Sequence, residues 1–183
     1  MSRNDAMQKY QEDPLSSQSL PGVGTRETLI AALETAVHPS SPPALLVIFR
    51  LEELDDYAST FGPGSARSLL ARLVLRLAGA LPPDTACFQP RWDELAALVP
   101  TPIAEAKPIL DAAAAALRER SGPVAVSASW GAAMLPEEAG DPIAALELAD
   151  ERLASTPPHR KAKRRDLHVP GPARRRSDEG RAQ

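Results

Sequence analysis

Few residues in this sequence have side chains that could do chemistry. The three histidines, His38, His159 and His168, are not spaced like metal ligands, and the single cysteine has no histidine near it in the sequence. No catalytic triad, phosphate-binding glycine loop or zinc motif is visible. An acidic pair, Asp93 and Glu94, lies between two short apolar segments. These carboxylates are either catalytic residues or exposed acids of a hairpin turn, and we favour the second interpretation.

The elements around this acidic pair can be predicted from hydrophobic patterning. Two short extended segments, Thr85–Pro90 and Leu95–Val99, are separated by Arg91–Glu94, which is typical of a β-hairpin. Cys87 lies on the first segment and is expected to be a small, buried apolar side chain. Earlier in the chain, Ala44–Leu51 is a continuous apolar run with one charge near its end. Such a run predicts a central strand that is buried on both faces.

A further strand and five helices complete the prediction. Val124–Leu135 alternates in part and indicates a strand. Thr25 can cap the first helix through its side-chain oxygen. The predicted helices are Arg26–Val37, Glu52–Thr60, Ser65–Leu81, Ala104–Arg120 and a last one from Asp141 or Pro142 to Ala154. This order predicts an α/β (α+β) fold with a mixed central sheet of about five strands flanked by helices.

Length and charge divide the 183 residues into three parts. Prolines cluster at both ends, so we expect a disordered N-terminal segment over 1–17, a folded domain over 18–157 and a basic, disordered tail over 158–183. The tail carries nine Lys/Arg and three Asp/Glu, a balance of +6 within a net charge of −3. It could contact phosphate or an anionic surface, or simply keep an acidic protein soluble. No apolar run approaches the ~20 residues of a transmembrane helix, and a lone cysteine suits a reducing compartment, so we expect a cytoplasmic protein.

The order of elements and five short motifs together resemble the GGDEF domain of bacterial diguanylate cyclases over about residues 18–157. The opening LPGVGTR (20–26) is similar to the family's LTGLPNR, LLVIFRLEEL (45–54) to LLLLIDLDGF, and YASTFGPGSARSLL (57–70) to YNDTFGHAAGDRLL. RWDEL (91–95) stands where GGDEF belongs, and ASWGAAMLP (128–136) and ADERL (149–153) are similar to VSIGVALLP and ADEAL. The resemblance implies a chemistry in which carboxylates hold Mg²⁺ ions on GTP while cyclic di-GMP is made.

Most positions that the family uses for this chemistry carry other residues. The metal-binding Asp at the end of the first strand corresponds to the cation Arg50, while Glu52 keeps a carboxylate at the next acidic position. The Asn and Asp that read guanine correspond to Ala58 and Arg67. The phosphate-binding Lys of the last helix corresponds to Pro157. Removing several groups that act as one unit is expected to leave essentially no reaction.

The signature itself is only half kept. Its paired glycines correspond to Arg91 and Trp92, whereas Asp93 and Glu94 are retained and Leu95 ends the motif. Glycine lets a nucleotide lie against the backbone because it has no Cβ, and an indole in its place is expected to fill the groove. The tryptophan therefore either packs across an emptied groove or contacts a partner.

The arginine that replaces the metal-binding Asp suggests a structural substitute for the ion. In the family arrangement Arg50 ends a central strand beside the hairpin. We hypothesise that its guanidinium lies where Mg²⁺ would have been and pairs with Asp93, Glu94 or Glu52. The other tryptophan, Trp130, replaces an apolar strand residue and is expected in the core.

From these substitutions the sequence predicts no bound cofactor, no metal site and no enzyme activity. We expect an inactive GGDEF-like signalling module in a cyclic di-GMP-related bacterial pathway, which contacts another signalling protein or itself. Two alternatives stay open. One is a divergent diguanylate or nucleotidyl cyclase that uses Glu52, Asp93 and Glu94, and the other is a non-catalytic receptor for GTP or cyclic di-GMP, against which Ala58 and Arg67 argue.

Overall fold

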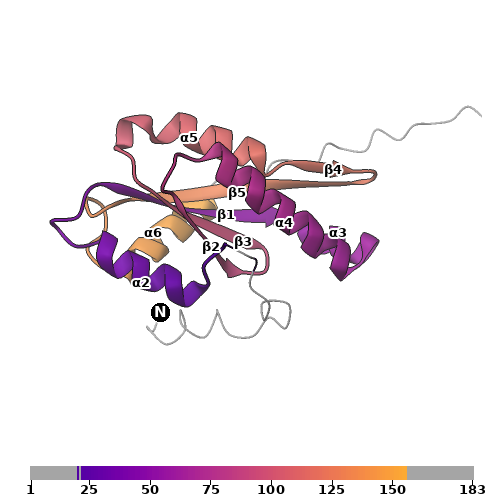
Figure 1. The fold of residues 1–183 in the computed structure, drawn as a ribbon, viewed down its shortest axis with the longest axis horizontal. Coiled ribbons are helices and arrows are strands. Elements are labelled where there is room, and N and C mark those ends of the chain that lie inside the picture. The colour runs from indigo at the N-terminus through magenta and orange to yellow at the C-terminus, as the bar shows by residue number, and fades with distance from the viewer. Residues whose placement is uncertain (1–19, 21, 156–183) are drawn as a thin grey trace, which may run out of the picture.

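A five-stranded sheet lies between two layers of helices (Figure 1). The computed structural model describes Leu20 and residues 22–155. The strand order is β2-β3-β1-β5-β4, so β1 lies in the middle, as its apolar sequence predicted. The strands are β1 (Ala44–Glu52), β2 (Ala86–Arg91), β3 (Glu94–Val99), β4 (Glu119–Ser121) and β5 (Val124–Leu135), and the helices are α2 (Arg26–Ala36), α3 (Leu54–Phe61), α4 (Pro63–Ala80), α5 (Ile103–Ala116) and α6 (Pro142–Ser155).

Side chains alternate between the two faces of β1 and build two separate cores. Val47 and Phe49 belong to the core under α3, α4 and α5, whereas Leu46 and Ile48 belong to the core under α2 and α6. All four side chains are almost completely buried. A strand that is covered on both faces must be apolar throughout, which explains the unbroken hydrophobic run.

A sheet with both parallel and antiparallel strand pairs was predicted, but the named strands of the described chain pair antiparallel. All four strand pairings are antiparallel, and among the described residues the parallel contact is an isolated bridge between Gly24 and Phe88. At this bridge the Gly24 amide donates to the Cys87 carbonyl at 2.9 Å. A Cβ at position 24 would lie 2.4 Å from the Phe88 ring, so only glycine allows the chain to come this close to β2.

The prediction of a helix over Ala104–Arg120 was too long at its C-terminal end. Helix α5 ends at Ala116, and Glu119–Ser121 forms the short strand β4, which pairs with the start of β5. Gly122, with φ of +57°, makes the tight turn between the two strands. A strand of three polar residues has no hydrophobic period that could reveal it in the sequence.

The structure also bears on the predictions for the cap of the first helix and for the burial of Cys87 and Trp130. The Thr25 hydroxyl accepts a hydrogen bond from the Thr28 amide, so it caps α2 as predicted. Cys87 and Trp130 are only partly buried, and both pack against the α3–α5 core. Burial raises the pKa of the Cys87 thiol, which therefore behaves as an apolar side chain. The predicted disordered segments 1–17 and 158–183 lie outside the described residues.

Candidate functional site

The end of β1 brings an arginine and a glutamate together. In the antiparallel register Arg50 lies directly opposite Glu94, the first residue of β3. The guanidinium Nη2 donates to the Glu94 carboxylate Oε1 at 3.0 Å. Side-chain exposure is 41% for Arg50 but only 3% for Glu94. The arginine therefore screens a carboxylate that the fold has otherwise removed from water.

This pairing leaves each group with a shifted pKa. Burial raises the pKa of Glu94, and the opposing effects of Arg50 and Arg91 do not cancel it. Arg91 contributes because its Nη1 lies 3.8 Å from the same carboxylate oxygen. Burial by itself would lower the pKa of Arg50, but the hydrogen bond and charge of Glu94 raise it overall. Arg50 thus stays a cation, and it stabilises the ionised form of its partner.

The interpretation of Asp93 and Glu94 as exposed acids of a hairpin turn was wrong for Glu94, which is buried. Asp93 beside it is half-buried. The hypothesis that Arg50 pairs with a neighbouring acid is confirmed for Glu94. Glu52 has another partner, since its carboxylate accepts a hydrogen bond from the Ser129 hydroxyl on β5. The three retained acids therefore lie at one end of the sheet but in different surroundings.

Trp92 is part of the core, although it lies in a hairpin turn. The indole is 5% exposed and belongs to the same core as Leu54 and Tyr57 of α3. Its Nε1 donates to the Asp55 carboxylate at 3.1 Å, which satisfies the polar end of the ring. Of the two roles predicted for it, packing across the groove is therefore the one that the structure shows. The indole connects the hairpin to the first turn of α3.

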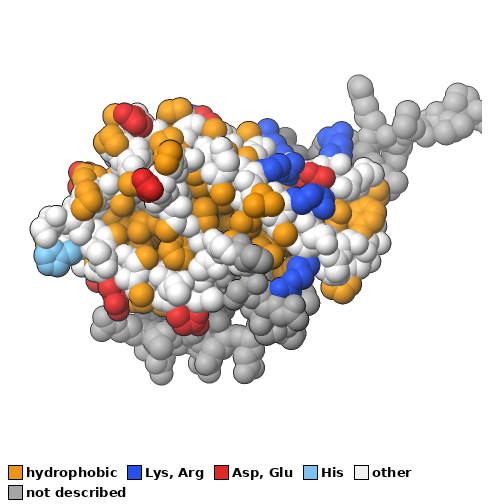
Figure 2. Space-filling model, viewed as in Figure 1, with side chains coloured by type: hydrophobic (Ala, Val, Ile, Leu, Met, Phe, Trp, Pro, Cys, Tyr) orange, Lys and Arg blue, Asp and Glu red, His pale blue; other side chains and the backbone are white. Residues whose placement is uncertain are grey.

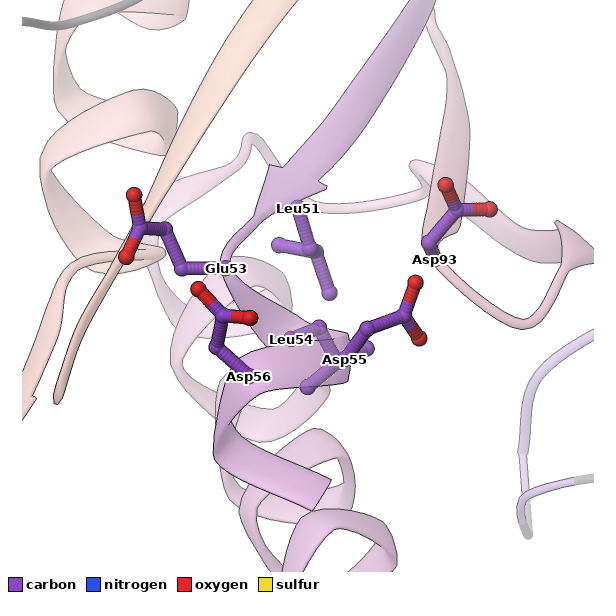
Figure 3. Close-up of a pocket in the computed structure, with 6 residues that line it drawn as sticks. All are labelled: Leu51, Glu53, Leu54, Asp55, Asp56 and Asp93. Carbon is purple, nitrogen blue, oxygen red and sulfur yellow. The ribbon is translucent and has the colours of Figure 1, made fainter. Parts of the chain in front are cut away.

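An open hollow of about 300 Å³ remains beside this tryptophan, between the end of β1, the start of α3 and the hairpin (Figure 3). Its wall contains the four carboxylates of Glu53, Asp55, Asp56 and Asp93, together with Leu51 and Leu54. Among the residues that the structure describes, no Lys or Arg lines it. Figure 3 shows that these acids come from two sides, Asp93 from the hairpin and the others from α3 and the residue before it.

The backbone at Glu53 has a left-handed conformation, which glycine adopts more easily than other residues. Glu53 has φ of +67°, and the similar motif LLLLIDLDGF has glycine at this position. A non-glycine residue in the left-handed region costs of order 1 kcal/mol, so the surrounding structure must hold this turn against that cost. Sequence reasoning missed Glu53 and Asp56 because their convergence on one hollow depends on tertiary structure.

The two positions that the resemblance assigns to guanine reading, Ala58 and Arg67, do not line this hollow. Ala58 on α3 is half-buried and packs against the α3–α5 core. Arg67 lies on α4 and is also half-buried. The position that corresponds to the phosphate-binding lysine, Pro157, lies outside the described residues. Neither described position offers the carboxamide or carboxylate that would read a guanine edge.

The residues at the end of β1 do not fit Mg²⁺. A magnesium ion needs oxygen ligands close to octahedral geometry, and here a guanidinium nitrogen already lies 3.0 Å from the Glu94 oxygen. In the part of the chain that the structure describes, no cluster of three or more His, Cys, Asp or Glu side chains could hold a metal. A positive charge from the protein itself stands beside the carboxylate.

Solved GGDEF domains share this fold. The GGDEF domain of PA1120 (TpbB or YfiN) from Pseudomonas aeruginosa matches with a TM-score of 0.63 and 22% identity, over 79% of this chain and 87% of that one. The GGDEF domain of DgcB from Caulobacter crescentus, in complex with c-di-GMP, matches with a TM-score of 0.63 and 15% identity, over 79% and 91%. The chain thus has the fold of a GGDEF domain, an α+β fold of the diguanylate cyclase type.

A third similar structure is the diguanylate cyclase SiaD from Pseudomonas aeruginosa, in complex with its activator SiaC. It matches with a TM-score of 0.63 and 21% identity, over 83% of this chain but only 60% of that one. No protein-family model matches the sequence, and no curated protein matches it. Among the described residues, no helix is both long and apolar enough to cross a membrane.

Proposed function

We propose that this chain is a GGDEF-fold domain that has lost the cyclase reaction and acts as a protein-binding module in a bacterial cyclic di-GMP-related pathway. The observation that carries the proposal is the ion pair between Arg50 and Glu94. Family chemistry needs a divalent cation held by carboxylates at this place, and a fixed guanidinium removes both the space and one ligand.

The neighbouring hollow supports the same proposal through its charge. Four carboxylates line it, and a triphosphate carries several negative charges, so each close approach would be repulsive. In working cyclases the metal ions neutralise such repulsion. The buried indole of Trp92 further fills the space beside the hollow, where the family has glycine.

The experiment is a turnover assay on the full chain with GTP and either Mg²⁺ or Mn²⁺, in which cyclic di-GMP and pyrophosphate are separated by chromatography. We expect neither product above the level of a reaction without protein. Glu94→Ala removes the paired carboxylate, and Glu34→Ala, an exposed acid on α2, is the matched control. Turnover that Glu94→Ala abolishes and Glu34→Ala preserves would show a divergent cyclase instead.

The receptor alternative is separated by binding rather than by turnover. A receptor would be stabilised by GTP or cyclic di-GMP, since a ligand that binds only the folded state raises Tm. We expect no such shift at millimolar nucleotide, because Ala58 and Arg67 replace both guanine-reading positions. A saturable shift with cyclic di-GMP would assign nucleotide binding to this domain and would contradict the protein-binding proposal.

A further inference from the structure

The outer face of helix α4 combines an apolar side chain with cations. Its solvent side carries Ser68, Arg72, Leu75, Arg76 and Gly79, all exposed, while the leucines of the opposite side are buried in the core. Leu75 is 74% exposed. Among the described residues, two large hydrophobic side chains are exposed, and Leu75 is more exposed than the other, Phe61. A single exposed leucine is ordinary. Its surroundings are what make this one informative.

The arginines on either side of this leucine both form ion pairs with one glutamate. Glu119 of β4 accepts Arg76 Nη1 at 3.1 Å and lies 3.8 Å from Arg72 Nη2. Arg76 Nη2 also donates to the backbone carbonyl of Arg118 at 2.9 Å. We call the surface formed by Arg72, Leu75, Arg76 and Gly79 the α4 outer face. Because two hydrogen bonds already position the Arg76 guanidinium, a partner would lose less side-chain entropy in contacting it.

Charge on this domain is segregated. Residues 20–155 contain ten Lys/Arg and eighteen Asp/Glu, a net charge of −8. Figure 2 shows that Lys and Arg nevertheless gather over α4 and the β4–β5 hairpin, around one acidic group. The α4 outer face is therefore positive on a negative domain, and it attracts acidic partners that the rest of the surface repels.

The side chains of the α4 outer face limit the kind of partner that could bind to it. A symmetric contact between two copies through this face would bring four arginines together, which costs several kcal/mol in like-charge repulsion. Nucleic acid would contact the arginines through phosphates but would gain nothing from Leu75. Protein partners use both, because arginine and central apolar contacts are enriched at interfaces. Gly79, one turn beyond Leu75, has open space where a side chain would stand, so a partner helix can approach closely there.

We infer that the α4 outer face docks an acidic amphipathic helix of another protein, with an apolar side chain on Leu75 and carboxylates on Arg72 and Arg76. The inference deepens the proposed function, since it names the surface and the chemistry of the partner. Its test uses no nucleotide, so its failure would leave the loss of cyclase chemistry untouched, and the reverse holds for the turnover assay.

The test measures fluorescence anisotropy of a labelled helical peptide made of Leu, Glu and Ala, with the leucines on one stripe and the glutamates beside them. We expect saturable binding by the full chain that weakens as salt rises from about 50 to about 300 mM, because exposed charges are screened. Leu75→Ala and Arg72→Ala should each weaken binding about fivefold or more, since contacts at the centre of an interface dominate affinity.

Lys107→Ala is the matched control, because Lys107 is an exposed cation of α5 in an ion pair with Asp111. It should change the dissociation constant by less than about twofold, as for charges away from an interface. Circular dichroism and Tm check that all variants are folded, and an exposed leucine replaced by alanine should leave both unchanged.

Four results would overturn the inference. The first is no binding at millimolar peptide, and the second is equal weakening by Lys107→Ala and Arg72→Ala, which would mean unspecific charge attraction. The third is equal or tighter binding of a peptide with Lys in place of Glu. Duplex DNA and anionic vesicles serve as competitors. If either displaces the peptide while Leu75→Ala has no effect, the face binds polyanions rather than an acidic helix.

Discussion

Two regions of the molecule differ in how far they match the family motifs. One is the contact between β5 and α6, and the other is the end of β1 beside the hairpin. At the first, Gly131 matches the glycine of the family motif VSIGVALLP, and the helix lies so close that a Cβ there would come within 2.0 Å of the Ala149 carbonyl oxygen. At the second, Arg50 and Trp92 stand where the similar motifs have an aspartate and a glycine, and they contact Glu94 and Asp55.

The difference separates what the fold needs from what the reaction needs. A glycine at a backbone-to-backbone contact has no substitute, because any side chain forces the helix away from the sheet. A metal ligand has a structural substitute, since a guanidinium can neutralise the same carboxylate. Under the proposed function, the end of β1 has lost its chemistry while the sheet is kept, and these two regions should therefore respond differently to substitution.

The largest effect is expected from Gly131→Ala. Its new methyl would meet the Ala149 carbonyl oxygen and the Leu153 amide nitrogen, at 2.0 and 2.4 Å, and neither backbone atom can move without displacing α6. We expect the free energy of unfolding to fall by about 3 kcal/mol or more, as for severe overpacking. Urea denaturation measures the loss.

The control for this variant is Gly140→Ala. Gly140 is exposed and has no atom within 4 Å of an added Cβ, so its substitution should change stability by less than about 0.5 kcal/mol. Equal losses for the two variants would show that the β5–α6 contact can relax, and the first half of the comparison would fail.

The second prediction concerns the ion pair at the end of β1. Arg50→Leu leaves Glu94 buried without its closest cation, and we expect a loss of about 2 kcal/mol. This is below the ~3–5 kcal/mol of a fully buried pair, because Arg50 is 41% exposed and water screens part of the interaction. The double variant Arg50→Leu, Glu94→Leu should recover most of the loss, since it removes the charge as well as its partner.

A double-mutant cycle converts these values into a coupling energy. We expect the two substitutions to be non-additive by about 1 to 2 kcal/mol, because the residues are in contact. Additive losses would mean that Arg50 and Glu94 act independently. The guanidinium would then be no structural substitute for a metal ion.

Much of this fold could be predicted from the sequence, because hydrophobic patterning reports burial directly. The apolar run Ala44–Leu51 became the central strand β1, and Thr25 caps α2 as its side chain suggested. Strand β4 could not be found, since Glu119–Ser121 is polar and is held by pairing with Val124–Val126 rather than by its own pattern. Local signals fail where a segment is defined by its neighbour.

The site was predictable only where the resemblance supplied a position for each residue. The resemblance placed Arg50 beside the hairpin acids, and the antiparallel register of the structure pairs it with Glu94. Burial of Glu94 was not predicted, because an acid in a turn is normally solvated. The convergence of Glu53, Asp55 and Asp56 with Asp93 depends on how α3 packs against the hairpin, which no local pattern encodes.

The smallest expected effects lie in the pH dependence of two carboxylates, one in each region. Glu138 accepts both Arg152 guanidinium nitrogens at 2.7 Å, and this hydrogen bonding lowers its pKa below the ordinary 4.5. Burial instead raises the pKa of Glu94 above 4.5. A carboxyl group whose pKa is lower in the folded state stabilises the protein at pH values above its pKa in the unfolded state, and this stabilisation is lost as pH falls. A carboxyl group whose pKa is higher in the folded state stabilises the protein at low pH, and this stabilisation is lost as pH rises.

The two Gln variants should therefore show opposite trends in urea denaturation between about pH 3 and about pH 6. The cost of Glu138→Gln should be smallest at the acid end and grow to about 0.5 to 1 kcal/mol as pH rises, a modest value because the pair is partly exposed. The cost of Glu94→Gln should be greatest at the acid end and shrink as the buried carboxyl ionises. If the costs of both variants changed with pH in the same direction, the structural interpretation would be wrong. It holds that the surroundings of Glu138 favour its charged form, whereas burial opposes the charged form of Glu94.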